Sequence, residues 1–280
     1  MLSSTRARGF MLIDTHCHIN MMVKKEFDVP LQSSELIATD TIVEQAHAHD
    51  VSIIINVGTR HVENSNCIAL AQRHKNVFAT VGIHPNDSDE WQDDLKAMKM
   101  WVLNKKENKI VGIGECGMDR YYPNHNLIRQ RDAFKAQIEL ALENNLALVV
   151  HSREAYDETL TILEEYKNNI TRAVMHCFSY DQAFADIVTS WNFMLGIGGT
   201  ITYPKNNALR SIVQSMNINN LVLETDAPFL PIQSMRGKQN HPQYIKEIAQ
   251  FIAELRGEPL KSIAKNTTSN SLALFDLQSF

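Results

Sequence analysis

Six side chains of the kinds that bind metal ions recur along the sequence, each just after a short apolar run. They are His16, His18, Glu115, His151, His176 and Asp226. The runs before them read LID, VGIG, LALVV, AVM and LVLET. Imidazole nitrogens and carboxylate oxygens bind divalent cations such as zinc, manganese and magnesium. Groups so widely spread along the chain can act together only if the fold brings the ends of these runs to one point.

A parallel β/α barrel does this, because its strands run in one direction and its active site lies at their carboxyl ends. Eight apolar, β-branched runs alternate with stretches of helical periodicity, which is the pattern of β/α units. The expected strands are Phe10–Ile13, Val51–Val57, Val77–Ile83, Ile110–Gly114, Leu146–Val150, Arg172–Met175, Phe193–Ile197 and Leu221–Glu224. The sequence therefore predicts the α/β class and a (β/α)8 TIM-type barrel.

No linker rich in proline, glycine and serine divides the 280 residues, so we predict a single domain over residues 11–280. Residues 1–10 are expected to be a disordered extension. The tail Gln243–Phe280 reads as one helix followed by a shorter one, and we expect both to complete the outer layer.

Composition limits the classes of function. The net charge of −5 argues against broad electrostatic adhesion to nucleic acid, although not against a nucleic-acid substrate held by metal ions and a few cations. No apolar stretch is long enough to span a membrane, and the start of the chain lacks the apolar region of a secretory signal. The four cysteines show no disulfide-framework spacing, so we expect a reducing, cytoplasmic location.

The H-x-H pair, His16 and His18, is expected on the first strand. Residues two apart on a strand face the same side, so both imidazoles should point into the barrel mouth while Cys17 points toward the helices. The same alternation predicts that Cys116 and Cys177 are small buried side chains rather than ligands. Asp14 shares the ligand face one layer deeper and is expected to accept an imidazole N–H.

Two metal subsites follow from the order of the strands. Asp226, on the eighth strand, should lie beside the H-x-H pair in the closed ring and complete one subsite, whereas His151 and His176 form the other. Glu115 is expected to bridge them, with one oxygen toward each ion. Paired ions acidify a bridging water and stabilise a phosphoryl centre. We expect Asp226 to accept the proton of that water, and Glu224, two residues earlier, to support the site from below.

Four further groups near the strand ends are expected to bind substrate. They are His84, Arg153, Arg236 and Lys238. Guanidinium and ammonium groups suit phosphate oxygens, but loop cations are also often simply solvated. The neighbouring Tyr121 and Tyr122 are interpreted either as a stacking surface for a base of a single strand or as packing.

Several ordered motifs resemble one family. DTHCH, GIHPND, GIGECGMDRYY, HSREA, HCFS and ETDAPFL are similar to those of the TatD family of metal-dependent hydrolases, within the amidohydrolase-like barrels, from about Met11 to the C-terminus. The resemblance implies an eight-fold β/α barrel, divalent metals, the same six ligand positions, and deoxyribonuclease activity of exonuclease type. This chain departs from the family pattern at Asn86, Tyr180 and His241, in loops expected to contact substrate, and their roles stay open.

These observations predict a metal-dependent hydrolase, with two divalent ions for each chain (Mg, Mn or Zn) and DNA as substrate. Four imidazoles suit zinc, manganese or iron better than magnesium, whereas the resemblance implies activity with magnesium. One alternative is hydrolysis of another ester, such as removal of a D-aminoacyl group from tRNA, because two metals polarise a carbonyl as well as a phosphoryl oxygen. The other alternative is a non-catalytic metal-binding scaffold.

Overall fold

The computed structural model describes residues 11–24 and 26–279. The predicted N-terminal extension, residues 1–10, lies outside this part of the chain. Eight strands form one parallel sheet in sequence order. Their bounds are β1 Leu12–Cys17, β2 Val51–Val57, β3 Val77–Val81, β4 Ile110–Asp119, β5 Ala147–Arg153, β6 Ala173–Met175, β7 Met194–Ile197 and β8 Leu221–Leu223.

Backbone hydrogen bonds close the ring between the last strand and the first. The N–H of Asp226 donates to the carbonyl of His16 at 2.8 Å, and the N–H of His18 donates to that of Ala227 at 2.7 Å. Each other strand pairs in parallel with the next. The predicted (β/α)8 barrel is therefore confirmed, and the closure sets the end of β8 against the H-x-H pair.

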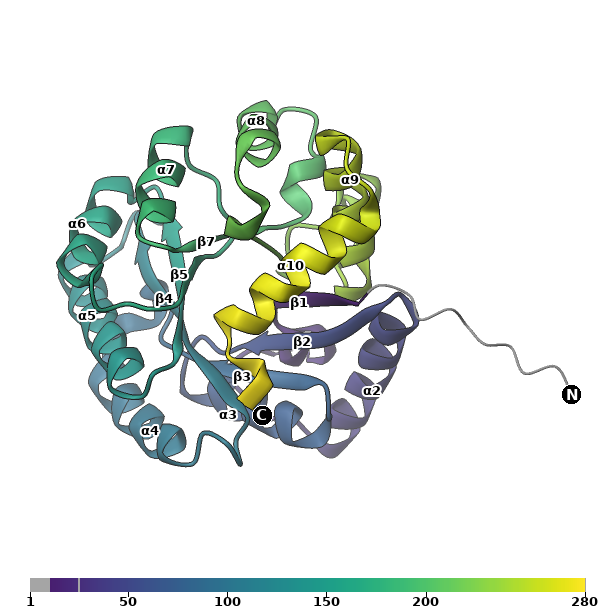
Figure 1. Ribbon diagram of the computed structural model, residues 1–280. Coiled ribbons are helices and arrows are strands. Elements are labelled where there is room, and N and C mark those ends of the chain that lie inside the picture. Colours follow the sequence, from purple (N-terminus) through teal and green to yellow (C-terminus); the bar gives the residue numbers. More distant parts are fainter. Residues whose placement is uncertain (1–10, 25, 280) are drawn as a thin grey trace, which may run out of the picture.

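Helices surround the sheet (Figure 1). Their bounds are α1 Ile19–Val23, α2 Ser33–Ala48, α3 His61–Arg73, α4 Trp91–Leu103, α5 Leu127–Glu143, α6 Tyr156–Tyr166, α7 Gln182–Ser190, α8 Asn207–Ser215, α9 Ile245–Arg256 and α10 Leu260–Leu274. Local chemistry fixes several ends. The Asp181 side chain accepts the Phe184 N–H at 2.9 Å at the start of α7, and Gly257, with φ of 65°, ends α9 in the left-handed conformation.

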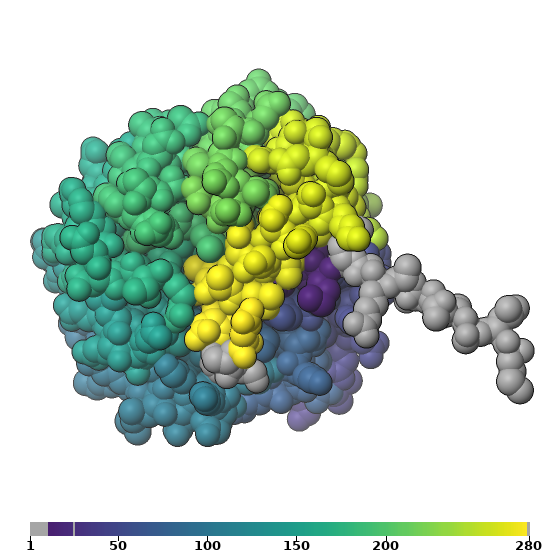
Figure 2. Space-filling view, viewed as in Figure 1, coloured from purple at the N-terminus to yellow at the C-terminus, as the bar shows by residue number. Residues whose placement is uncertain are grey.

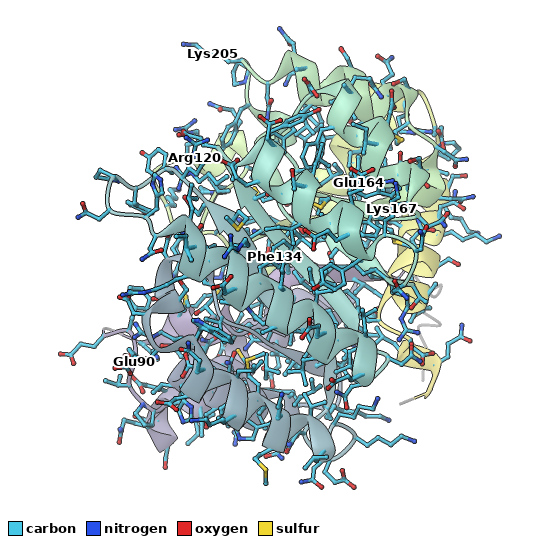
Figure 3. All side chains as sticks on the ribbon, turned by 90° about the vertical axis from the view of Figure 1, so that its left-hand side faces the viewer. Glu90, Arg120, Phe134, Glu164, Lys167 and Lys205 are labelled. Atoms are coloured by element: carbon cyan, nitrogen blue, oxygen red, sulfur yellow. The ribbon has the colours of Figure 1, made fainter. Side chains whose placement is uncertain are left out.

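The outer helices are amphipathic. On the face shown in Figure 3, Glu164 of α6 and Lys167, directly after that helix, form a surface ion pair at 2.9 Å, whereas Phe134 of α5 is fully buried. Among the described residues, no helix is both long and apolar enough to cross a bilayer.

The last helix forms a floor for the barrel. α10 runs across the barrel (Figure 1) and covers the centre of this face (Figure 2). Leu274, Phe275 and Leu277 pack in one buried cluster with strand residues such as Val111 and Val149. The prediction that both final helices complete the outer layer is thus wrong for α10, which is also longer than α9. Its last turn closes the end of the barrel opposite the carboxyl ends of the strands.

Candidate metal centre

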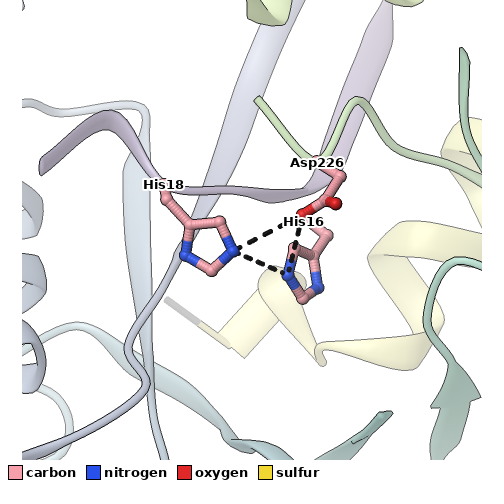
Figure 4. A group of neighbouring side chains, drawn as sticks. All are labelled: His16, His18 and Asp226. Carbon is pink, nitrogen blue, oxygen red and sulfur yellow. Dashed lines mark hydrogen bonds and ion pairs between the residues drawn. The ribbon is translucent and has the colours of Figure 1, made fainter. Parts of the chain in front are cut away.

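The first predicted subsite is assembled at the carboxyl ends of β1 and β8 (Figure 4). The Nε2 atoms of His16 and His18 lie 3.2 Å apart. Asp226 Oδ1 is 3.7 Å from the first nitrogen and 3.5 Å from the second. Glu115 Oε2 is 3.4 Å and 3.8 Å from the same two atoms. Four potential ligand atoms from three strands therefore converge on one point.

These separations fit a bound cation. In a tetrahedral site with ligand bonds of about 2.1 Å, ligand atoms lie about 3.4 Å apart. Two imidazole nitrogens at 3.2 Å share at most one proton between them, and both carboxylates face the same space. The set of two nitrogens and two oxygens suits zinc or manganese.

The second predicted subsite lies on the other side of Glu115. Its Oε1 atom is 2.6 Å from His151 Nδ1 and 3.5 Å from His176 Nε2. His84 Nε2 is a third nitrogen near this oxygen, at 3.7 Å. Glu115 thus presents one oxygen to each group of histidines, which is the arrangement that a bridging carboxylate needs.

Close approach of β4 to β5 sets the position of Glu115. A Cβ atom on Gly117 would lie 1.9 Å from the His151 carbonyl oxygen, and one on Gly114 would lie 2.4 Å from that of Val149. Both glycines also have positive φ, 148° and 132°, where other residues are strained. Glycine at these two positions therefore lets β4 pack closely against β5 and places Glu115 between them.

The site carries a negative charge that favours cations. Burial would raise the pKa of Glu115, but the imidazoles of His176, His151 and His16 outweigh it and hold that pKa well below its ordinary value. Burial likewise opposes ionisation of Asp226, but the hydrogen bond from His18 and nearby imidazole charge lower its pKa. Both carboxylates are consequently ionised at neutral pH.

His176 shows the opposite effect. Burial lowers its pKa, but the carboxylates of Glu224 and Glu115 raise it to about 10. Without a metal this imidazole holds a proton, which a cation must displace because only neutral imidazole is a ligand.

A cavity of about 600 Å³ opens above the two groups of ligands. Among the predicted substrate-binding residues, His84 and Arg153 line it. The Arg153 guanidinium lies 3.4 Å above the centre of the Tyr121 ring, so this tyrosine packs against the cation. Tyr122, by contrast, lines the cavity and is half exposed.

The other two predicted substrate-binding residues lie elsewhere. Arg236 and Lys238 are exposed and are not among the described residues that line the cavity. The Arg236 guanidinium packs over the Tyr203 ring at 4.7 Å. A direct role at the metal centre is therefore not supported by their position, and contact with a more distant part of a substrate stays a prediction.

Two supporting residues differ from expectation. Asp14 does not bind an imidazole; it accepts hydrogen bonds from the Thr225 hydroxyl at 2.5 Å, the Thr225 N–H at 2.9 Å and the His16 backbone N–H at 3.3 Å. Sequence reasoning missed Asp119, whose Oδ2 atom lies 3.1 Å from His151 Nε2. It lies four residues after Glu115 on β4. Had the expected fourth strand extended to residue 119, strand alternation would have placed Asp119 on the same face as Glu115.

The predicted burial is confirmed for Cys17 and Cys116 and is wrong for Cys177, and the absence of cysteine ligands stays a prediction. Cys17 and Cys116 are fully buried in the core between sheet and helices. Cys177 instead lines the cavity, and its sulfur lies within 4.8 Å of ligand atoms of His176 and Asp226. Strand alternation does not apply there, because β6 ends at Met175 and Cys177 has φ of +46°.

Two of the open positions have structural partners. Asn86 donates to Asp119 Oδ2 at 3.0 Å. The Tyr180 hydroxyl lies 2.8 Å from Ser152 Oγ and accepts the Ala155 N–H at 3.1 Å. Asn86 thus ties the segment after β3 to the end of β4, and Tyr180 ties the segment after β6 to the end of β5.

Comparison with known proteins agrees with this geometry. The profile of the family described as TatD related DNase matches residues 13–276. The metal-dependent hydrolase YabD of Bacillus subtilis is 32% identical over 266 residues, which cover 95% of this chain and 99% of that protein. The 3'-5' ssDNA/RNA exonuclease TatD of Erwinia amylovora is 32% identical over 244 residues, covering 85% and 93%.

Solved structures share the fold. The crystal structure of YJJV, a TatD homologue from Escherichia coli, has a TM-score of 0.84 and 28% identity, and covers 95% of this chain and 98% of that one. An organophosphorus hydrolase variant has a TM-score of 0.70 at 10% identity, which shows the barrel alone.

Proposed function

The chain belongs to the TatD family of metal-dependent hydrolases, and from this premise we propose that it is a deoxyribonuclease that removes nucleotides from the end of a single strand. The observation that carries the proposal is the position of Glu115 between two groups of histidines, one oxygen toward each. We further propose that these groups hold two divalent ions (Mg, Mn or Zn), with His16, His18 and Asp226 as ligands of one and His151 and His176 as ligands of the other.

When bound, such cations acidify water and stabilise charge on phosphodiester oxygens. Asp226 is the proposed proton acceptor. One of its carboxylate oxygens faces the H-x-H imidazoles, while the second points away from both rings (Figure 4). Because its pKa lies below the ordinary value, Asp226 is ionised at neutral pH, and its free oxygen is available to accept a proton. Glu115 has both oxygens occupied by histidine neighbours and is the poorer base.

Residues of the cavity wall support a nucleic-acid strand as substrate. Arg153 can bind a phosphate by two parallel hydrogen bonds, and its packing on Tyr121 fixes the guanidinium plane. Tyr122 and Phe229 also line the cavity, and both are exposed, at 51% and 45%. Exposed rings at a site rim stack on unpaired bases. A cavity of about 600 Å³ encloses the end of a strand rather than a duplex.

We propose the cytoplasm as the location, since the four cysteines are free thiols, as is usual in a reducing compartment. Arg236 and Lys238, outside the cavity, are proposed to contact phosphates further along the strand.

The proposal is tested by incubating the full chain, with Mn²⁺ or Mg²⁺, with a labelled single-stranded DNA, its duplex, an RNA of the same sequence and a D-aminoacyl-tRNA. We expect the single-stranded DNA to shorten stepwise from one end. Release of amino acid from an intact tRNA, with no shortening of DNA, would identify an ester hydrolase of the other class. A fully metallated protein inactive on every substrate would indicate a binding scaffold.

A further inference from the structure

Imidazoles that bind metals usually hold their second nitrogen by a hydrogen bond, which fixes the tautomer and the orientation of the ring. Two of the four histidines proposed as ligands have such a partner. His18 Nδ1 is 2.8 Å from the Val57 carbonyl oxygen, and His151 Nε2 is 3.1 Å from Asp119. His16 and His176, one from each proposed subsite, remain.

Unsatisfied buried atoms gather around these two rings. Within the described part of the chain, five buried side-chain nitrogen or oxygen atoms have no aligned hydrogen bond, and three of them are His16 Nδ1, His176 Nδ1 and Glu224 Oε2. Of these, His176 Nδ1 has an ion-pair contact, with Glu224 Oε1 at 3.1 Å. The two rings stack, with centroids 3.5 Å apart. One nitrogen of each ring and one Glu224 oxygen lie within 4.8 Å of one another. Buried polar atoms without partners are costly, so their clustering points to a shared role.

The fold makes a specific space for Glu224. Its side chain is 1% exposed, and Oε1 accepts the Cys177 backbone N–H at 2.6 Å and lies 3.1 Å from His176 Nδ1. On the neighbouring strand, a Cβ atom at Gly196 would lie 2.3 Å from Glu224 Oε2. The absence of a side chain at this one position therefore admits the carboxylate beneath the two imidazoles.

We propose that Glu224 is a positioning residue that accepts an N–H from both His176 and His16, Oε1 from the first and Oε2 from the second. Each ring is thereby held with its proton on Nδ1 and its Nε2 lone pair toward the metal centre. One carboxylate thus aligns a ligand of each subsite. The inference rests on the proposed function, because it assumes that these histidines bind metal.

Two substitutions and a matched control test it. Glu224→Gln removes one acceptor oxygen. Gly196→Ala leaves the carboxylate in the chain but places a methyl group against Oε2. Gly198→Ala, two residues along the same chain segment, meets Glu224 atoms only at 3.6 Å or more and is the control. Metal-free proteins are titrated with Zn²⁺ by calorimetry, and the protonated ring nitrogens of the loaded proteins are identified by ¹⁵N NMR.

Loss of an outer hydrogen-bond partner typically weakens metal affinity by about 10- to 100-fold. We expect such a loss at both sites in Glu224→Gln and in Gly196→Ala, with a changed tautomer at His16 and His176, and none in Gly198→Ala. Weakening at only one site, or unchanged affinity at both, overturns the shared role. If Glu224→Gln does not fold, Gly196→Ala decides. A wild-type protein that binds no metal would instead refute the proposed function.

Discussion

Replacing Asp226 by asparagine separates its two proposed roles, as ligand and as proton acceptor. The oxygen that faces the H-x-H pair, 3.5 Å from His18 Nε2 and 3.7 Å from His16 Nε2, is kept as an amide oxygen. The second oxygen becomes an NH₂ group, which accepts no proton. Asparagine also tolerates the left-handed backbone at this position, where φ is +58°, so the loop keeps its conformation.

Loss of a general base slows a reaction by about 10²- to 10⁴-fold, which corresponds to about 3–5 kcal/mol in the barrier. We therefore expect the kcat of Asp226→Asn on a labelled single-stranded oligonucleotide to be lower than that of the wild type by about this factor, with KM little changed. Mass spectrometry should show that the variant keeps most of its metal. Asp132→Asn, on α5 with a side chain that is 44% exposed, is the control for a lost surface charge. Near-wild-type turnover with the full metal content would show that Asp226 is not the proton acceptor.

Three further predictions concern the surroundings of the centre. Arg153→Ala should raise KM about 10-fold or more with a smaller effect on kcat, because a charged hydrogen bond to phosphate contributes about 1.5–3 kcal/mol; steady-state kinetics on the same oligonucleotide checks this, and an unchanged KM would count against phosphate binding. Burial would raise the pKa of Asp119, but hydrogen bonds from His151 and Tyr121 lower it to about 2, so its contribution to stability is complete above about pH 4 and is lost as the pH falls through 2. As the pH falls over this range, the free energy of unfolding of metal-free Asp119→Asn should accordingly decrease less steeply than that of the metal-free wild type. Equal slopes for the two proteins would show that the Asp119 carboxylate does not stabilise the fold in this way. Cys17→Ala should leave metal stoichiometry unchanged, as its sulfur lies in the core away from the histidines; a lost equivalent of metal would refute that placement.

The barrel and the convergence of six side chains of the types that bind metals were predictable because both follow from one repeated pattern. Apolar runs alternating with helical stretches define parallel strands, and a polar group after each run must then lie at the carboxyl end of the sheet. The bridging position of Glu115 follows in the same way, since β4 lies between the strands that carry the two groups of histidines in the closed ring.

Other parts of the site depend on contacts that no local pattern encodes. Asp119 was missed because β4 continues five residues beyond Gly114, the expected end, and pairs Asp119 with Arg153 on β5. Cys177 faces the cavity because its backbone is left-handed, which breaks the alternation of a strand. The residue pattern of an amphipathic helix likewise does not show which surface its apolar face covers. For this reason α10 was expected in the outer layer, although its last turn closes one end of the barrel.

The central claim, that one carboxylate joins two metal subsites, is tested most directly by anomalous diffraction from crystals soaked in Mn²⁺. We expect two anomalous peaks about 3.5–4 Å apart, the usual separation in two-metal sites. One peak should lie between His16, His18 and Asp226, the other beside His151 and His176, with a Glu115 oxygen toward each. A single peak, or a peak that Glu115 does not contact, would contradict it.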